Sequence, residues 1–209
     1  MTFGAEVRVG VVGAGAMGAG IAQVAAQRGH AVVLADAFPA SLNKAREAHA
    51  KALAREVEKG RVPQADADAA LARIAYVDGA GELGLRAFAD CGLVIEAIVE
   101  DLGAKQHLFR ALEEIVAPDA VLATNTSSLS VAALAGSVKR SHRVLGIHFF
   151  NPAPVMPLVE VIPALATDAA ITDAARALVE NWGKIPVVAS DTPGFIVNRI
   201  ARPFYGEAL

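Results

Sequence analysis

The chain has 209 residues, enough for one large domain or for one domain and the beginning of a second. Its composition, 54% hydrophobic but only 5% aromatic, is typical of buried parallel strands covered by helices, and the single cysteine, Cys91, excludes an intrachain disulfide. The net charge of -3 disfavours nucleic acid and anionic membrane surfaces as partners, and the lack of a secretion signal or a long apolar run predicts a cytoplasmic protein.

The first 36 residues predict a βαβ unit. The apolar run Val7–Val12 is short, β-branched and followed by glycines, as expected for a buried strand. Helix-forming residues at helical spacing then occupy Ala16–Arg28, and Gly29 is a typical stop signal. A second buried strand, Ala31–Ala35, ends at Asp36 and completes the unit.

Two predicted helices and a short strand follow. Ser41 is the candidate N-cap of a long charged helix that runs to about Lys59. A second helix follows Pro63 and leads into the short strand Ala75–Asp78. We expect this segment to be a helical excursion from the strand and helix alternation.

The alternation resumes with the strand Gly92–Ile98, the helix Lys105–Val116 and the strand Val121–Asn125. Cys91 immediately precedes the first of these strands and is interpreted as a small buried hydrophobic residue. Buried strands that alternate with helices are typical of a doubly wound, mostly parallel sheet. The sequence therefore predicts an α/β fold of the Rossmann type.

The remaining elements close this unit. A short helix after Ser130 leads into the strand Arg143–Phe149, which can pair antiparallel with Leu158–Ile162 across a proline-rich turn. A helix at Asp168–Trp182 and a strand at Pro186–Ala189 follow. These elements complete the predicted sheet.

A last helix, opened by the motif DTPGFIVNRI, has no visible partner in the sequence. It stops with an apolar face exposed and no terminating signal. We therefore expect a Rossmann domain over residues 1–190 and, over residues 191–209, the first helix of a truncated C-terminal helical domain.

Gly13, Gly15 and Gly18 spell G-x-G-x-x-G between the first strand and the first helix. The first glycine permits a tight turn, the second lets the backbone approach a pyrophosphate, and the third allows close helix and strand packing. The free N–H groups of the helix N-terminus, at Ala16 and Met17, face the anion. In this context the motif predicts a dinucleotide site, and chance occurrence in a glycine-rich chain is the minor alternative.

Asp36 indicates which of the two dinucleotides, NAD or NADP, the site favours. It lies 18 positions after Gly18, where a carboxylate can accept hydrogen bonds from the adenine ribose and repels a 2'-phosphate. No arginine or lysine follows at once in ADAFPAS to pair with such a phosphate. We expect NAD as the cofactor rather than NADP, the alternative being a solvated aspartate at a strand end.

His148 and Glu160 are the candidate acid–base pair. Each lies six residues from Pro154, so a reversal centred there brings them opposite each other on paired strands. A carboxylate on one imidazole nitrogen fixes the tautomer and stabilises the imidazolium that forms when the other nitrogen takes a proton, as the oxidation of an alcohol requires. A structural histidine near a surface glutamate is the alternative.

The other four histidines are weaker candidates. His30 lies at a helix–strand turn, His49 and His107 lie on helices that we expect to be solvated, and His142 lies in a polar loop. No group among them has the spacing of metal ligands, so no metal is expected.

A polar turn, Thr124–Ser128, falls at the carboxyl end of a predicted parallel strand. Ligands bind at this edge of such sheets, and small hydroxyls there suit a polar ligand. The alternative is a turn that caps the next helix.

Five segments, taken in order, resemble one known family. They are GAGAMGAGIAQVAAQRGH, EAIVEDLGAKQHLF, NTSSLS, HFFNPAPVMPLVEV and DTPGFIVNR. Together they span nearly the whole chain and resemble the NAD-binding domain of the L-3-hydroxyacyl-CoA dehydrogenases. The ending ARPFYGEAL resembles the first helix of the helical domain that follows in that family.

The resemblance implies a reversible, NAD-dependent oxidation of an (S)-3-hydroxyacyl-CoA to a 3-ketoacyl-CoA, in fatty-acid β-oxidation or a related degradation of CoA thioesters. It also implies that the full-length protein is a homodimer. His148 matches the family's catalytic base and Glu160 its orienting partner, while Ser127 and Asn198 match residues that contact the substrate hydroxyl or support the histidine. The remaining matched residues are Glu100, Lys105, Ser127 and Asn151 for NAD and Lys59 for the CoA phosphates.

Two other functions stay open from the sequence. The chain can be an NAD-binding module that is inactive without a C-terminal domain, or a β-hydroxyacid dehydrogenase that acts on free acids. The NTSS and HFFNP segments disfavour the second by resemblance. At Ala52, where the family can present a serine to CoA, this chain offers only a methyl group.

Overall fold

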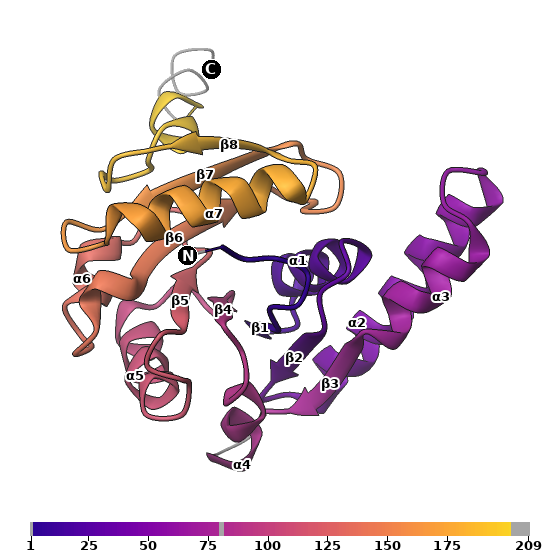
Figure 1. Cartoon of the computed structure of the whole chain (residues 1–209), viewed down its shortest axis with the longest axis horizontal. Helices are drawn as coiled ribbons and strands as arrows, with labels where there is room; N and C mark the ends of the chain where they lie inside the picture. The colour runs from indigo at the N-terminus through magenta and orange to yellow at the C-terminus, as the bar shows by residue number, and fades with distance from the viewer. Residues whose placement is uncertain (1, 80–81, 202–209) are drawn as a thin grey trace, which may run out of the picture.

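A computed structural model describes residues 2–79 and 82–201. Its middle layer is an eight-stranded sheet with the strand order β3-β2-β1-β4-β5-β6-β7-β8 (Figure 1). Neighbouring strands from β3 to β6 are parallel, β7 is antiparallel to β6, and β8 is parallel to β7. The strands are β1 (Val9–Val12), β2 (Val32–Asp36), β3 (Ile74–Asp78), β4 (Leu93–Glu96), β5 (Val121–Thr124), β6 (Val144–Phe149), β7 (Leu158–Pro163) and β8 (Ile185–Val188).

Helices flank this sheet on both faces. They are α1 (Ala16–Gln27), α2 (Pro39–Glu58), α3 (Gln64–Ala72), α4 (Glu82–Leu85), α5 (Leu102–Glu113), α6 (Val131–Ala135) and α7 (Ala169–Asn181), with 3-10 turns at Arg86–Phe88 and Ser141–Arg143. The order and direction of the strands confirm the predicted Rossmann-type fold. No helix of the described residues is long and apolar enough to cross a membrane.

The core lies in two clusters, one on each face of the sheet. On one face Ile21 of α1 and Leu178 of α7 pack in the same cluster as Val11 of β1. On the other face Phe109 of α5 and Val131 of α6 pack with the alternate strand residues. Because both faces are covered, the strands are apolar almost throughout, and each buried aliphatic side chain contributes about 1.5–3 kcal/mol.

The segment between β2 and β3 extends outward as two helices that fold back on each other, α2 and α3 (Figure 1). A small cluster around Leu53 holds them together. The two predicted helices are therefore present outside the sheet. The short strand that follows them, β3, pairs in parallel with β2 at the edge of the sheet. The expectation that Ser41 caps α2 is wrong: the helix begins at Pro39 after Phe38, because proline at the first helical position already has the required φ.

A hydrogen-bond chain joins the end of α7 to the turn after α1 and to the residues just before β1. Trp182, at the end of α7, donates its indole N–H to Nε2 of His30 at 3.0 Å. Nδ1 of His30 donates to the carbonyl oxygen of Val7 at 2.9 Å, just before β1. This places His30 at a helix–strand turn, as expected, and gives it a structural role.

Cys91 is 1% exposed and packs in the α5 and α6 cluster, as its position before a strand suggests. Burial raises the pKa of its thiol to about 12, and nearby Arg8 opposes this only in part. Since the thiolate is the reactive form, we expect iodoacetamide to label the native protein very slowly at pH 8 and the urea-unfolded protein rapidly. Rapid stoichiometric labelling in native buffer, read by mass spectrometry, would contradict this packing.

Candidate active site

The glycine-rich loop connects β1 to α1, and its three glycines meet different physical requirements. Gly13 has φ +101°, and a Cβ there would lie 2.5 Å from the carbonyl oxygen of Ala97. A Cβ at Gly18 would overlap the carbonyl oxygen of Gly13. Gly15 is different, because a Cβ there would have no neighbour within 4 Å. The first and third glycines therefore serve the fold, whereas Gly15 leaves open space at the amino end of α1.

Asp36 lies beside this loop at the end of β2. Its Oδ2 accepts from the backbone N–H of Ala14 at 2.7 Å, and its Oδ1 accepts from that of Phe38 at 2.8 Å. The carboxylate also lines a cavity of about 940 Å³ together with Gly13 and Gly15. This orientation fits a dinucleotide whose pyrophosphate meets the loop and whose ribose meets Asp36.

The side chains of this cavity also bear on the choice between NAD and NADP. Among the described residues that line it there is no lysine or arginine, and Asp36 and Glu114 are the acidic ones. Among these described residues, a 2'-phosphate would meet the Asp36 carboxylate and no lysine or arginine. The cavity therefore fits NAD and disfavours NADP.

Substitution by alanine should affect NAD binding at Gly15 and the stability of the fold at Gly18. Gly15→Ala should leave the free energy of unfolding within about 1 kcal/mol of wild type but weaken NAD binding about tenfold or more, because the methyl group enters space that a pyrophosphate needs. Gly18→Ala should cost about 3 kcal/mol or more, because backbone must move. Urea unfolding and calorimetric titration with NAD measure both; equal NAD affinity for Gly15→Ala and wild type would contradict this arrangement.

His148 and Glu160 lie directly opposite each other on β6 and β7, as the spacing about Pro154 predicts. Nδ1 of His148 lies 2.7 Å from Oε2 of Glu160, and both side chains are almost fully buried. A carboxylate only accepts hydrogen bonds, so Nδ1 carries the proton and Nε2 keeps a free lone pair. The pair thus has the orientation of a general base with its supporting carboxylate.

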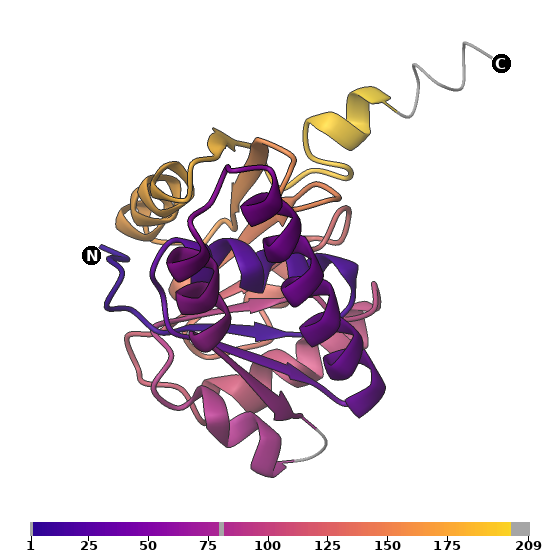
Figure 2. The same ribbon diagram turned by 90° about the vertical axis from the view of Figure 1, so that its right-hand side faces the viewer.

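The second oxygen of Glu160 anchors the segment after β8. Its Oε1 accepts from the backbone N–H groups of Ile196 and Val197 at 3.0 and 2.9 Å. These residues lead into the helical residues 197–201, which stand clear of the layered body in Figure 2. Phe195 and Phe150 pack near the imidazole, with ring centroids 5.9 and 4.5 Å from that of His148. One carboxylate therefore fixes both the histidine and the next segment of the chain.

Ser127 and Asn198 come together at the same edge of the sheet. Asn198 donates from Nδ2 to the carbonyl oxygen of Ser127 at 3.3 Å. Oε1 of Glu100 accepts from the Ser127 backbone N–H at 2.9 Å and from the Thr126 hydroxyl at 2.5 Å. Burial raises the pKa of Glu100, but these hydrogen bonds and the charge of Lys105 outweigh it, so the net pKa is lowered.

Glu96 is not among the site residues that the sequence predicts. This residue ends β4, is fully buried, and accepts from Nζ of Lys105 at 2.5 Å and from the Thr124 hydroxyl at 2.7 Å. Lys105 is also buried and lies 3.3 Å from Oε2 of Glu100. The available signal was an acidic residue inside an otherwise apolar strand, which requires a buried partner.

The other predicted site residues are more exposed. Lys59 lies at the C-terminal cap of α2 and approaches Glu56 at 4.0 Å. Asn151 follows β6, is exposed, and precedes a cis peptide bond to Pro152. Met17, at the start of α1, packs partly against the core, whereas Ala16 is exposed. The described structure brings none of these side chains into the network around His148.

The expectation that His49 is solvated is wrong. It is 1% exposed, donates from Nε2 to the carbonyl oxygen of Ala19 at 2.8 Å, and accepts at Nδ1 from the Tyr76 hydroxyl at 2.7 Å. Burial lowers its pKa, and the hydrogen bond to Ala19 opposes this. The inner face of α2 packs on α1, which a single charged helix in the sequence does not reveal. His107 is exposed, as expected.

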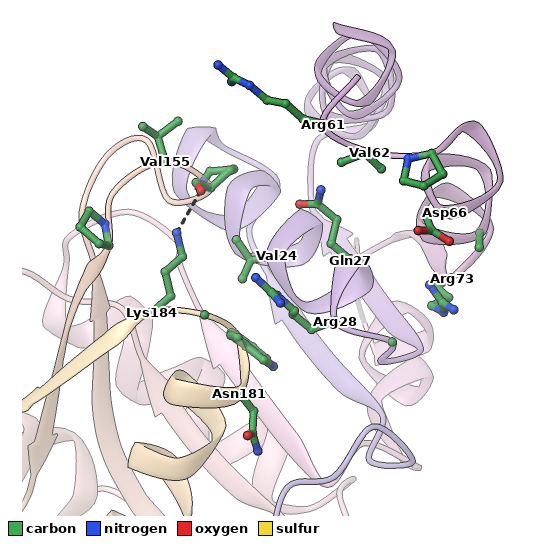
Figure 3. A pocket seen from close by; sticks show the side chains of 17 residues that line it. Val24, Gln27, Arg28, Arg61, Val62, Asp66, Arg73, Val155, Asn181 and Lys184 are labelled. Carbon is green, nitrogen blue, oxygen red and sulfur yellow. Dashed lines mark hydrogen bonds between the residues drawn. The ribbon is translucent and has the colours of Figure 1, made fainter. Parts of the chain in front are cut away.

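A second cavity, of about 890 Å³, lies between the end of α1, the connection from α2 to α3, and the β6–β7 turn (Figure 3). Four cationic side chains line it, but three already have internal partners. Arg61 pairs with Glu56, Arg73 donates to the carbonyl oxygen of Ala26, and Lys184 donates to three carbonyl oxygens of the turn. Lys184 thereby fixes the turn that joins the strands of His148 and Glu160.

The family model for the NAD-binding domain of 3-hydroxyacyl-CoA dehydrogenase matches residues 8–192. The chain is 46% identical over 200 residues to 3-hydroxyadipyl-CoA dehydrogenase of Escherichia coli, covering 96% of this chain and 41% of that protein. It is 42% identical to a probable 3-hydroxybutyryl-CoA dehydrogenase of Deinococcus radiodurans, covering 97% of this chain and 71% of that protein.

Solved structures agree with these sequence matches. The crystal structure of (S)-3-hydroxybutyryl-CoA dehydrogenase from Ralstonia eutropha superimposes with a TM-score of 0.91 at 39% identity, covering 96% of this chain and 69% of that one. That of 3-hydroxybutyryl-CoA dehydrogenase from Escherichia coli gives a TM-score of 0.92 at 45% identity, covering 97% of this chain and 42% of that one. The chain thus spans between about two fifths and seven tenths of these relatives.

Proposed function

The chain belongs to the 3-hydroxyacyl-CoA dehydrogenase family through its NAD-binding domain, and on this premise we propose that it oxidises (S)-3-hydroxyacyl-CoA reversibly to 3-ketoacyl-CoA. The observation that carries the proposal is the buried contact of 2.7 Å between His148 and Glu160. It supplies a base at the carboxyl edge of a sheet that also carries the loop for NAD.

His148 takes the proton of the substrate hydroxyl on Nε2. The contact of Nδ1 with Glu160 holds the ring in the required tautomer and stabilises the imidazolium that forms. NAD, when bound, would accept the hydride that leaves the carbon bearing this hydroxyl. Phe150 and Phe195 pack near the ring and restrict water there.

Ser127 and Asn198 are the proposed contacts of the reacting oxygen. The proposal is supported by the hydrogen bond from the Asn198 amide to the backbone carbonyl oxygen of Ser127, which keeps the two residues adjacent, while the Ser127 hydroxyl donates to Oε1 of Glu100 at 3.3 Å. A donor at this point stabilises the charge that develops on the oxygen as its proton leaves. Glu100, Lys105 and Asn151 are proposed to contact the nicotinamide half of NAD.

The substrate requires recognition of CoA as well as of the hydroxyacyl group. We assign its phosphates to Lys59, whose side chain is exposed at the end of α2. Residues 1–190 are the proposed cofactor domain, and the residues that follow begin a helical domain. The proposal also includes a homodimer of the longer protein, located in the cytoplasm and acting in the degradation of fatty acids or related CoA thioesters.

His148→Gln should reduce turnover by about 10²–10⁴-fold while NAD binding persists, because the base is lost and the cofactor loop is untouched. The measurement is NADH formation from NAD and (S)-3-hydroxybutyryl-CoA, with NAD affinity determined in parallel by calorimetry. His142→Gln is the matched control, since His142 lies in a 3-10 turn outside the site, and it should retain wild-type turnover.

The outcomes separate the possible functions. Turnover of free 3-hydroxybutyrate equal to that of its CoA thioester would replace the proposal with a free-acid dehydrogenase. NAD binding without turnover by the wild-type chain would show an NAD-binding module that needs a further domain. Equal turnover of His148→Gln and wild type would contradict the role of the base.

A further inference from the structure

Three charged side chains form a connected group below the carboxyl edge of the sheet. Nζ of Lys105 lies 2.5 Å from Oε1 of Glu96 and 3.3 Å from Oε2 of Glu100. The side chains of Lys105 and Glu96 are 1% and 0% exposed, whereas that of Glu100 is 40% exposed and faces the edge. We refer to these residues as the acidic triad.

The geometry fixes the acidic triad in place. Oε1 of Glu96 accepts from the Ile98 backbone N–H at 2.7 Å, and Oε2 accepts from the Thr124 hydroxyl at 2.7 Å. Glu100 is held by the Thr126 hydroxyl and the Ser127 N–H. These contacts span β4, β5 and α5, so Glu96 cannot turn away without breaking a buried hydrogen bond, and Glu100 cannot turn away without losing its bonds to Thr126 and Ser127.

The charge of the acidic triad is unbalanced. One ammonium group faces two carboxylates, which leaves a net charge of about -1 in a group of which Lys105 and Glu96 are shielded from water and Glu100 is partly exposed. A single glutamate is sufficient to pair with a buried lysine, so the second carboxylate is not needed to neutralise it. An excess negative charge at low dielectric acts on any charged group bound above it.

The nicotinamide ring is such a group. In this fold a dinucleotide lies across the switch point beside β1, with its two halves on opposite sides of the glycine loop. The cavity at Asp36 takes the adenosine half, which leaves β4, β5 and β6 for the nicotinamide half. The ring carries a positive charge when oxidised and none when reduced.

We infer that the acidic triad Glu96–Lys105–Glu100 discriminates between the two redox forms of the cofactor, stabilising bound NAD⁺ relative to bound NADH. The inference rests on the proposed function for the position of the nicotinamide half. Glu96 acts as a positioning residue, because it holds Lys105 and adds its charge from below without contacting the cofactor. Part of the negative charge that favours NAD⁺ therefore lies on Glu96, which is buried beneath Glu100 and the other residues proposed to contact NAD.

The test is the ratio of the NADH and NAD⁺ dissociation constants, measured by NADH fluorescence and by calorimetry. Glu96→Gln should weaken NAD⁺ binding about threefold to tenfold and change NADH binding by less than about twofold. Neutral contacts common to both forms cancel in the ratio, so a purely structural role of Glu96 would leave it unchanged. Glu113→Gln removes one charge from the other end of α5 and is the matched control, for which the ratio should stay at the wild-type value.

Glu100→Gln is a second variant, which keeps the test valid if Glu96→Gln does not fold. The side chain of Glu100 is partly exposed, so its replacement disturbs the core less. It should shift the ratio in the same direction as Glu96→Gln. Unchanged ratios in both variants, with NAD⁺ and NADH still bound, would overturn the inference and leave the proposed dehydrogenase intact. Failure of the wild-type chain to bind either form would overturn both.

Discussion

The carboxylate of Glu160 is the contact on which the arrangement of the site depends. It is fully buried, and its two oxygens hold different parts of the chain, since Oε2 holds His148 and Oε1 holds the backbone of Ile196 and Val197. A buried carboxylate is stable only when its oxygens are satisfied in this way. His148 and the segment after β8 are therefore fixed together, and removing the carboxylate would release both.

Two other carboxylates at the carboxyl edge of the sheet are also held by hydrogen bonds to both of their oxygens. Asp36 at the end of β2 accepts two backbone N–H groups, and Glu96 at the end of β4 accepts one together with a lysine and a threonine. In each case an acidic group lies at a strand end and accepts one N–H from the loop that follows and at least one further hydrogen bond from a neighbouring element. Asp36 lines the cavity that fits the adenosine half of a dinucleotide, whereas Glu96 is buried beneath the same edge of the sheet. The edge is preorganised before any ligand arrives.

Local patterns predict much of this structure. Short β-branched runs give the strands, and the equal distances of His148 and Glu160 from Pro154 give their pairing, which the register confirms. What the sequence does not reveal depends on packing between distant elements. His49 is buried because α2 lies on α1, and Glu96 becomes part of the site only because α5 brings Lys105 beneath β4. The start of α2 differs because Pro39, and not Ser41, fixes the first turn.

A crystal structure of the chain with NAD⁺ and 3-ketobutyryl-CoA tests the role of His148 most directly. We expect the 3-oxygen of the acyl group within about 3 Å of Nε2 of His148, with the nicotinamide ring over the carboxyl ends of β4 and β5. A ligand oxygen distant from His148, or a nicotinamide ring bound elsewhere, would contradict the assignment of His148 as the base.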